Sequence, residues 1–156
     1  MNVHRYERWW LTFGIAMLVI FLAIIGFAAF ADHINPPTGM RQIDPTKVSQ
    51  TPPFDKPGLR KLGDGSYEAY YVAKVFNFDP AILTVPTGAK VTFYVTSADV
   101  VHGFFIPNTD INMMVIPGWV NVESHTFTRP GEYLLICHEY CGIGHQNMFG
   151  KIEVRS

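Results

Sequence analysis

A long run without any charged side chain is the feature that most constrains how this chain folds. It extends from Leu11 to Ala31 and reads LTFGIAMLVIFLAIIGFAAFA. As an α-helix rising about 1.5 Å per residue, the run is about 31 Å long, which matches the hydrocarbon core of a bilayer. We therefore expect one N-terminal transmembrane helix that inserts into a lipid bilayer.

A secretory signal peptide is the alternative interpretation of this run, because Ala29-Phe30-Ala31 resembles an A-x-A cleavage site. Two features favour a permanent anchor. The apolar run is longer than the hydrophobic region of a usual signal peptide. In addition, Trp9 and Trp10 lie just before it, where interfacial aromatic residues occur in membrane proteins.

The charges on either side of the run predict its orientation. Arg5 and Arg8 precede it, whereas Asp32 and His33 follow it and the next basic residue is Arg41. The positive-inside rule then places the N-terminus in the cytoplasm and the rest of the chain outside. We expect a single-pass protein of a prokaryotic cell membrane, with a periplasmic or extracellular C-terminal domain.

The remaining sequence divides into two parts. Residues 33–66 are rich in proline and lack apolar periodicity, so we expect an extended connector that lies over another surface or stands the domain off the membrane. A connector of this length is uncommon unless something holds it, which points to a partner subunit. Residues 67–156 form the expected globular domain, and residues 1–32 form the anchor. A formal net charge of −1 is too little positive charge for a nucleic-acid-binding protein.

Short alternating apolar runs separated by turn residues begin at Tyr67. In residues 90–96, for example, one face carries Val91, Phe93 and Val95. No stretch of useful length with helical periodicity follows residue 66. Several such runs within about 90 residues are typical of an antiparallel β-sandwich or barrel, so the expected fold class is all-β.

The segment CHEYCGIGHQNM, residues 137–148, contains both cysteines of the chain. Cys137 and Cys141 are followed by His145 and Met148, so thiolate, imidazole and thioether donors lie close together in sequence. This soft set favours copper over magnesium, calcium or manganese. Upstream, we expect His102 to end one strand and Gly103-Phe104 to open the next, and loops cluster at one end of a sandwich. We therefore expect His102 to approach this segment.

Three other interpretations use the same residues. Two exported cysteines commonly form a disulfide, and the two cysteines with His102 and His145 suit a tetrahedral zinc site. A mononuclear blue copper site needs only one cysteine. The Met148 thioether favours copper over zinc, and the second cysteine favours a pair of copper ions bridged by both sulfur atoms.

The pattern CxExC-x3-H-x2-M, preceded by DVxHGF and a PGxY strand, resembles the binuclear CuA domain of cytochrome c oxidase subunit II. The resemblance covers residues 67–156. The single helix and the GHQNMFG ending are most similar to the B-family oxidases of thermophiles. This resemblance implies a cupredoxin-like Greek-key β-sandwich behind one N-terminal transmembrane helix, with two copper ions bound.

The resemblance also implies which residues bind copper. Cys137 and Cys141 would bridge the two ions, and His102 and His145 would each bind one of them. Met148 would be a weak ligand to one copper, and the backbone carbonyl of Glu139 would bind the other. The implied metal set is therefore His102, Cys137, Glu139, Cys141, His145 and Met148, and no catalytic residue is implied.

The function implied by the resemblance is electron relay within a terminal respiratory oxidase. A cytochrome c or a small copper protein would deliver electrons from outside, and haem in oxidase subunit I would receive them and reduce oxygen to water. A membrane-anchored copper-delivery protein, a mononuclear cupredoxin and the CuA domain of nitrous oxide reductase are the alternatives. A delivery protein does not need a ligand loop closed onto a distant histidine, and 156 residues are too few for the propeller domain of that reductase.

Overall fold

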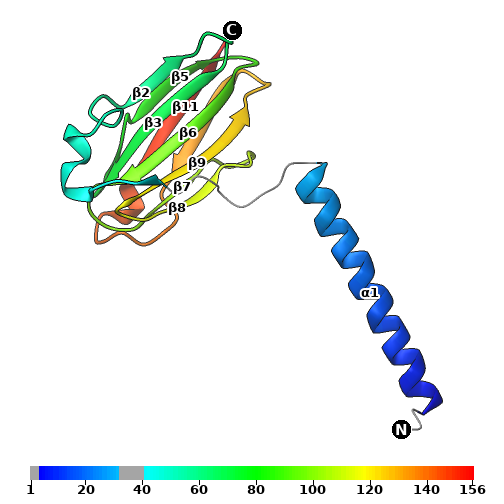
Figure 1. Ribbon diagram of the computed structural model, residues 1–156. Coiled ribbons are helices and arrows are strands. Elements are labelled where there is room, and N and C mark those ends of the chain that lie inside the picture. Colours follow the sequence, from blue (N-terminus) through cyan, green and yellow to red (C-terminus); the bar gives the residue numbers. More distant parts are fainter. Residues whose placement is uncertain (1–3, 32–40) are drawn as a thin grey trace. The chain divides into compact units, whose positions relative to one another are not determined.

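The computed structural model describes residues 4–31 and 41–156 (Figure 1). Within these residues, one helix is long and apolar enough to cross a membrane. It is α1 (Arg5–Phe30), which has a mean hydropathy of 2.7 and no buried residue. At the first turn of the helix, the Glu7 carboxylate accepts a hydrogen bond from the His4 N–H. At its end, the Ala31 N–H donates a hydrogen bond to the Phe27 carbonyl oxygen. The flanking Asp32 and His33 lie outside the described residues. Length and composition thus agree with the expected anchor.

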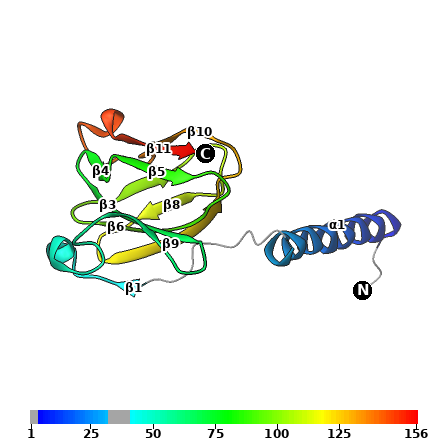
Figure 2. The same ribbon diagram turned by 90° about the horizontal axis from the view of Figure 1, so that it is seen from above.

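The β unit consists of two sheets packed face to face, which Figures 1 and 2 show from two directions. The first sheet contains, in spatial order, β1 (Arg41–Gln42), β9 (Trp119–Thr126), β6 (Lys90–Ser97), β3 (Tyr67–Lys74) and β2 (Gly58–Lys61), with β4 (Asn77–Asp79) paired to β3. The second contains β5 (Ile82–Pro86), β11 (Phe149–Arg155), β10 (Gly131–Ile136), β7 (His102–Phe105) and β8 (Asn112–Val115).

The β-sandwich expected from the sequence is confirmed, but the expectation that all strand pairs are antiparallel is wrong. β3 and β6 run parallel, with Tyr71 opposite Val95, and β5 and β11 run parallel, with Leu83 opposite Ile152. The reason is that β5 follows β3 and β4 in the chain but belongs to the other sheet. The chain crosses to the second sheet and returns, so β6 enters the first sheet in the same direction as β3.

The described part of the proline-rich segment packs on the first sheet. Arg41 pairs with Val120 of β9, and β2 pairs with β3. Between them, the short 3₁₀ helix η1 (Pro45–Gln50) and the loop after it place Val48 and Phe54 in a buried cluster with Tyr70, Val72 and Val120. From residue 41 onward, this segment therefore lies over the outer face of its own β unit.

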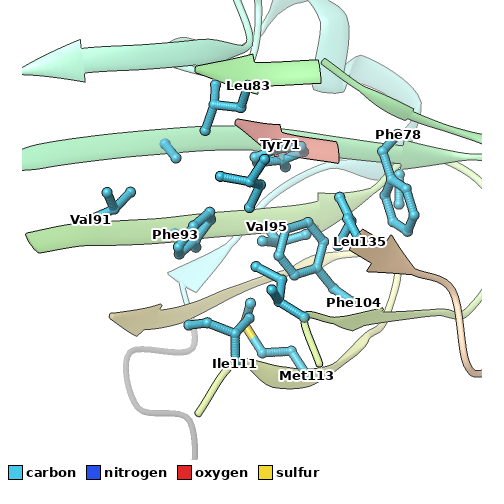
Figure 3. Close-up of a cluster of buried hydrophobic side chains, with 14 of the residues drawn as sticks. Tyr71, Phe78, Leu83, Val91, Phe93, Val95, Phe104, Ile111, Met113 and Leu135 are labelled. Carbon is cyan, nitrogen blue, oxygen red and sulfur yellow. The ribbon is translucent and has the colours of Figure 1, made fainter. Parts of the chain in front are cut away.

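Aromatic side chains fill the space between the two sheets (Figure 3). Phe104 of β7 lies at their centre, with ring centroids 5.0 Å from Tyr71, 5.6 Å from Phe78 and 5.9 Å from Phe93. The same buried cluster also includes Cys137, Cys141 and Met148. The sulfur atoms of these three residues therefore belong to the packed core, which fixes their positions and excludes water.

Candidate metal centre

The two ends of the segment 137–148 are held together by a strand pair. β10 ends at Ile136 and β11 begins at Phe149, and these two residues are direct antiparallel partners. Cys137 N–H then donates to Met148 O at 3.2 Å, and the short 3₁₀ helix η2 (His145–Asn147) turns the loop back toward its start. Local pairing alone thus brings the first cysteine and the methionine together.

His102 reaches this loop from the neighbouring strand. It is the first residue of β7, whereas β6 ends at Ser97, so the expectation that His102 ends the preceding strand is wrong. β7 lies beside β10, and its histidine side chain is fully buried. The next residue, Gly103, has no Cβ, and a Cβ there would lie 2.6 Å from the backbone nitrogen of His138. This glycine lets the segment 137–148, called the ligand loop below, approach the strand closely.

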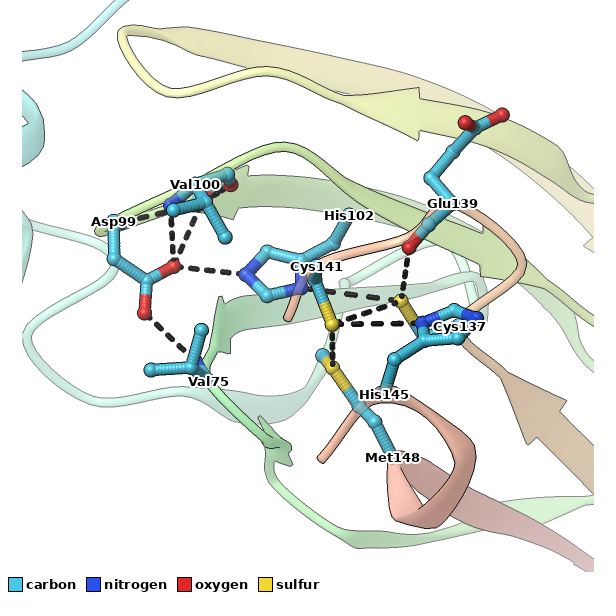
Figure 4. Close-up of polar contacts among 10 residues, drawn as sticks. Val75, Asp99, Val100, His102, Cys137, Glu139, Cys141, His145 and Met148 are labelled. Atoms are coloured by element: carbon cyan, nitrogen blue, oxygen red, sulfur yellow. Dashed lines mark hydrogen bonds and ion pairs between the residues drawn. The ribbon is translucent and has the colours of Figure 1, made fainter. Parts of the chain in front are cut away.

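The structure brings all six residues of the expected metal set together, as Figure 4 shows. The two Sγ atoms lie 3.8 Å apart. Cys137 Sγ lies 3.9 Å from His102 Nδ1 and 3.3 Å from the carbonyl oxygen of Glu139. Cys141 Sγ lies 3.6 Å from His145 Nδ1 and 3.7 Å from Met148 Sδ. The Glu139 carboxylate points away from the sulfur atoms.

These spacings suit a transition metal and not a disulfide. A disulfide holds its sulfur atoms about 2.05 Å apart, whereas both cysteines here are free and 3.8 Å apart. Donors that bind a metal at about 2.0–2.3 Å with tetrahedral angles lie about 3.3–3.8 Å from one another. The ligand atoms of His102, Cys137 and Cys141 all lie within 4.8 Å of each other, so the residues fit a metal centre.

Burial sets the electrostatics of the two thiols. Cys137, Cys141, His102 and Met148 are all buried. Burial, together with the neighbouring Cys137 thiol, raises the pKa of the Cys141 thiol to about 11. Two thiolates in such a site require a positive charge beside them. A metal cation supplies that charge and displaces the thiol protons when it binds.

Asp99 is a residue of the site that the sequence analysis did not single out. Its carboxylate lies 2.8 Å from His102 Nε2 and accepts hydrogen bonds from the backbone N–H groups of Val75 at 2.7 Å and Val100 at 2.6 Å. Burial raises the pKa of Asp99, but these hydrogen bonds, led by that with His102, outweigh burial and hold the pKa below its usual value. The sequence signal was its place three residues before the histidine in DVxHGF.

Phe76 is a second residue that the sequence analysis did not identify. Its ring packs on the ligand loop, where a Cβ on Gly144 would lie 2.5 Å from the ring and a Cβ on Gly142 would lie 3.1 Å from it. The two glycines of the loop therefore make room for the aromatic ring, which covers the segment between Cys141 and His145. No local pattern around residue 76 points to this contact.

Comparisons with known proteins show which sequences and structures this chain is similar to. Residues 67–155 match the family model described as cytochrome c oxidase subunit II, periplasmic domain. Cytochrome c oxidase subunit 2 of Thermus thermophilus is 43% identical over 154 residues, which is 96% of this chain and 92% of the relative.

Two solved structures extend the comparison. A chain of a haem–copper terminal oxidase dimer superimposes with a TM-score of 0.80 at 33% identity, over 97% of this chain and 100% of that one. The periplasmic domain of subunit II of the Bradyrhizobium japonicum cytochrome oxidase has the same fold, with a TM-score of 0.54 at 22% identity, over 57% of this chain and 83% of that domain. The expected cupredoxin-like fold class is thereby confirmed.

Proposed function

The chain belongs to the cytochrome c oxidase subunit II family and serves as an electron-transfer subunit of a haem–copper terminal oxidase, and from this premise we propose that its copper site holds a pair of ions. The ligands in this proposal are His102, Cys137, Glu139 through its carbonyl, Cys141, His145 and Met148. When bound, the copper pair supplies a one-electron couple in which two metals and two sulfur atoms share the change in charge.

The observation that carries the proposal is the number of donors around the two sulfur atoms. Five side chains and one backbone carbonyl converge there, with contacts of 3.3–3.9 Å to Cys137 or Cys141. A single tetrahedral ion uses fewer donors than this. With both thiolates shared, each of two ions would still have an imidazole and one weaker donor. The thioether of Met148 favours copper over zinc in this role.

The protein frame supports rapid electron transfer by holding these donors still. Cys137 and Met148 directly adjoin the paired ends of β10 and β11, and His102 begins β7 beside them. Both cysteines and Met148 belong to the close-packed core and His102 is fully buried, whereas His145 is half-buried. The buried donors therefore have little freedom to move and little water beside them to reorient when the charge of the centre changes. The chain thus contributes a rigid ligand set that is largely shielded from water.

We further propose the partners of this relay. The electron donor is a cytochrome c or a small copper protein, and the acceptor is haem in oxidase subunit I, where oxygen is reduced. Tyr140 and Ile143 of the ligand loop are 78% and 88% exposed. They offer an apolar contact to a protein partner within two residues of Cys141, and a short path is what electron transfer across an interface requires.

The chain is anchored to a membrane by its apolar helix, and we propose the prokaryotic cell membrane with the N-terminus in the cytoplasm. Arg5 and Arg8 at the start of α1 support this orientation. The match over 97% of this chain to a subunit of a solved oxidase includes most of α1, which supports a retained anchor. In functional terms, we propose that residues 1–32 anchor the chain and that the copper ligands lie within residues 67–156. From residue 41 onward, the segment expected as a connector (33–66) packs on the β unit that carries these ligands.

The test uses the full chain in detergent, loaded with copper and dialysed against a mild chelator. We expect about two coppers per chain, a purple colour and an electron paramagnetic resonance signal with hyperfine splitting shared by both nuclei. Cys137→Ser and Cys141→Ser should each abolish this signal, whereas His125→Asn, a histidine outside the site, should leave it unchanged.

Three results would contradict the proposal. One copper with an intense blue band would identify a mononuclear site. A colourless chain that retains zinc would exclude a redox role. A shared-copper signal that survives either cysteine replacement would exclude bridging by that sulfur atom.

A further inference from the structure

The carboxylate of Asp99 is shared between two segments that meet at the metal centre. Asp99 lies in the loop between β6 and β7, and its Oδ1 faces His102 Nε2 at 2.8 Å and the N–H of Val100 at 2.6 Å. Its Oδ2 accepts the N–H of Val75 at 2.7 Å. Figure 4 shows the carboxylate between the imidazole of His102 and Val75.

The first contact determines which ring nitrogen of His102 faces the sulfur atoms. An ionised carboxylate only accepts hydrogen bonds, so the nitrogen that faces Asp99, Nε2, must carry the proton. The other nitrogen, Nδ1, then keeps a free lone pair. Nδ1 is the atom that lies 3.9 Å from Cys137 Sγ. The tautomer that Asp99 selects is therefore the one that presents a lone pair to a metal.

The second contact is with Val75, in a segment that packs on the ligand loop. Val75 lies in the loop between β3 and β4, and the residue after it, Phe76, packs its ring on Gly142 and Gly144. One carboxylate therefore links His102 to the backbone beside the ring that covers the ligand loop. Because this carboxylate side chain is only 29% exposed, its charge is partly shielded from solvent and acts on the site at short range.

We propose that Asp99 is a positioning residue of the copper centre, which holds His102 with Nδ1 toward the metal and whose negative charge stabilises the oxidised state. This inference rests on the proposed role of His102 as a ligand. A negative charge beside a ligand favours the more positive metal state and raises the basicity of the imidazole. Loss of that charge therefore raises the reduction potential.

A purely structural role for Asp99 makes a different prediction. In that case the carboxylate would only close the turn by accepting hydrogen bonds from the Ser97 hydroxyl and the Val100 N–H. Its replacement would change stability but neither the tautomer of His102 nor the potential of the folded copper centre. The tautomer and the potential are thus the readouts that separate the two roles.

The first measurement needs no variant and no copper. The full chain with ¹⁵N-labelled histidine is prepared metal-free in detergent micelles at pH 8, and the ring nitrogens of His102 are identified by long-range proton–nitrogen correlation. We expect the proton on Nε2. A proton on Nδ1 would overturn the proposal, and this outcome does not depend on how many copper ions the chain binds.

The second measurement compares Asp99→Asn with a matched control, Asp110→Asn. Asp110 is also an aspartate beside a histidine, with its carboxylate 3.3 Å from His125 Nδ1, but it lies outside the proposed site and its replacement changes the net charge equally. We expect a positive shift of the midpoint potential in Asp99→Asn at unchanged copper content, and none in Asp110→Asn. Equal potentials in wild type and both variants would refute the proposal.

A third variant, Asp99→Ala, removes every contact of the carboxylate. We expect its copper retention against a chelator to fall about 10–100-fold, the usual cost of losing a partner that orients a metal ligand. Unchanged retention in the folded variant would contradict a positioning role. If this variant or Asp99→Asn does not fold, the tautomer of the wild-type chain decides the question.

Discussion

Gly144→Ala should destabilise the protein through a single contact, the ring of Phe76. Gly144 has φ −97° and ψ 8°, which alanine also adopts, so the backbone itself opposes the change little. An added Cβ would lie 2.5 Å from Cδ2, 2.7 Å from Cγ and 2.9 Å from Cε2 of the Phe76 ring. Either the ring or the ligand loop has to move.

The magnitude follows from two opposing effects. Overpacking of this kind costs about 1–3 kcal/mol, whereas replacing glycine by alanine at a compatible backbone position restricts the unfolded chain and contributes about 0.4–1 kcal/mol of stability. We expect a net loss of about 0.5–2 kcal/mol for Gly144→Ala. At about 4 °C per kcal/mol, this loss lowers the midpoint of thermal unfolding by about 2–8 °C.

A double-mutant cycle with Phe76→Ala isolates the contact. In the Phe76→Ala background the ring is absent, so Gly144→Ala should be neutral or stabilise by up to about 1 kcal/mol. Gly63→Ala is the matched control, because nothing lies within 4 Å of a Cβ at Gly63. Its effect should be the same in both backgrounds.

The assay is thermal unfolding of the detergent-solubilised full chain, followed by near-ultraviolet circular dichroism, with copper content measured on the same samples. Equal destabilisation by Gly144→Ala in both backgrounds would refute the reasoning, because it would trace the cost to the backbone and not to the ring. A coupling energy of about 1–3 kcal/mol between the two positions, by contrast, is the result that packing of Phe76 on the loop requires.

Three further predictions concern other parts of the β unit. Met148→Leu conserves volume and should cost less than about 1.5 kcal/mol of stability. Copper should stay bound while the reduction potential rises, because the weak ligand that we propose is lost. An unchanged potential in redox titration would assign Met148 to the core alone. Among the described residues the buried Tyr71 hydroxyl has no hydrogen-bond partner, so Tyr71→Phe should stabilise the fold by about 1 kcal/mol, and a lower unfolding midpoint would contradict this. Phe54→Ala should cost up to about 3–5 kcal/mol and speed proteolysis within residues 41–66, whereas unchanged cleavage would show that Phe54 does not hold this segment on the sheet.

Features set by local spacing were predictable from the sequence. The uncharged run predicted α1, because a membrane span depends on length and composition alone. Alternation in residues 90–96 predicted β6 with Val91, Phe93 and Val95 buried, as the structure has them. Most of the proposed metal site could also be predicted, because most of its donor residues lie in one short segment between two strands and need no distant contact to come close.

Only the tertiary structure decided which distant segments meet. The parallel pairs β3–β6 and β5–β11 arise because the chain changes sheets between them, and periodicity within one strand carries no information about the direction of its neighbour. Prolines predicted an extended segment, but the burial of Phe54 on the first sheet depends on the surface that the other strands present. Likewise, the contact of the Asp99 carboxylate with His102 and that of the Phe76 ring with Gly142 and Gly144 form only in the folded chain. Donor types are a property of the sequence, whereas their orientation and shielding depend on packing between residues far apart along the chain.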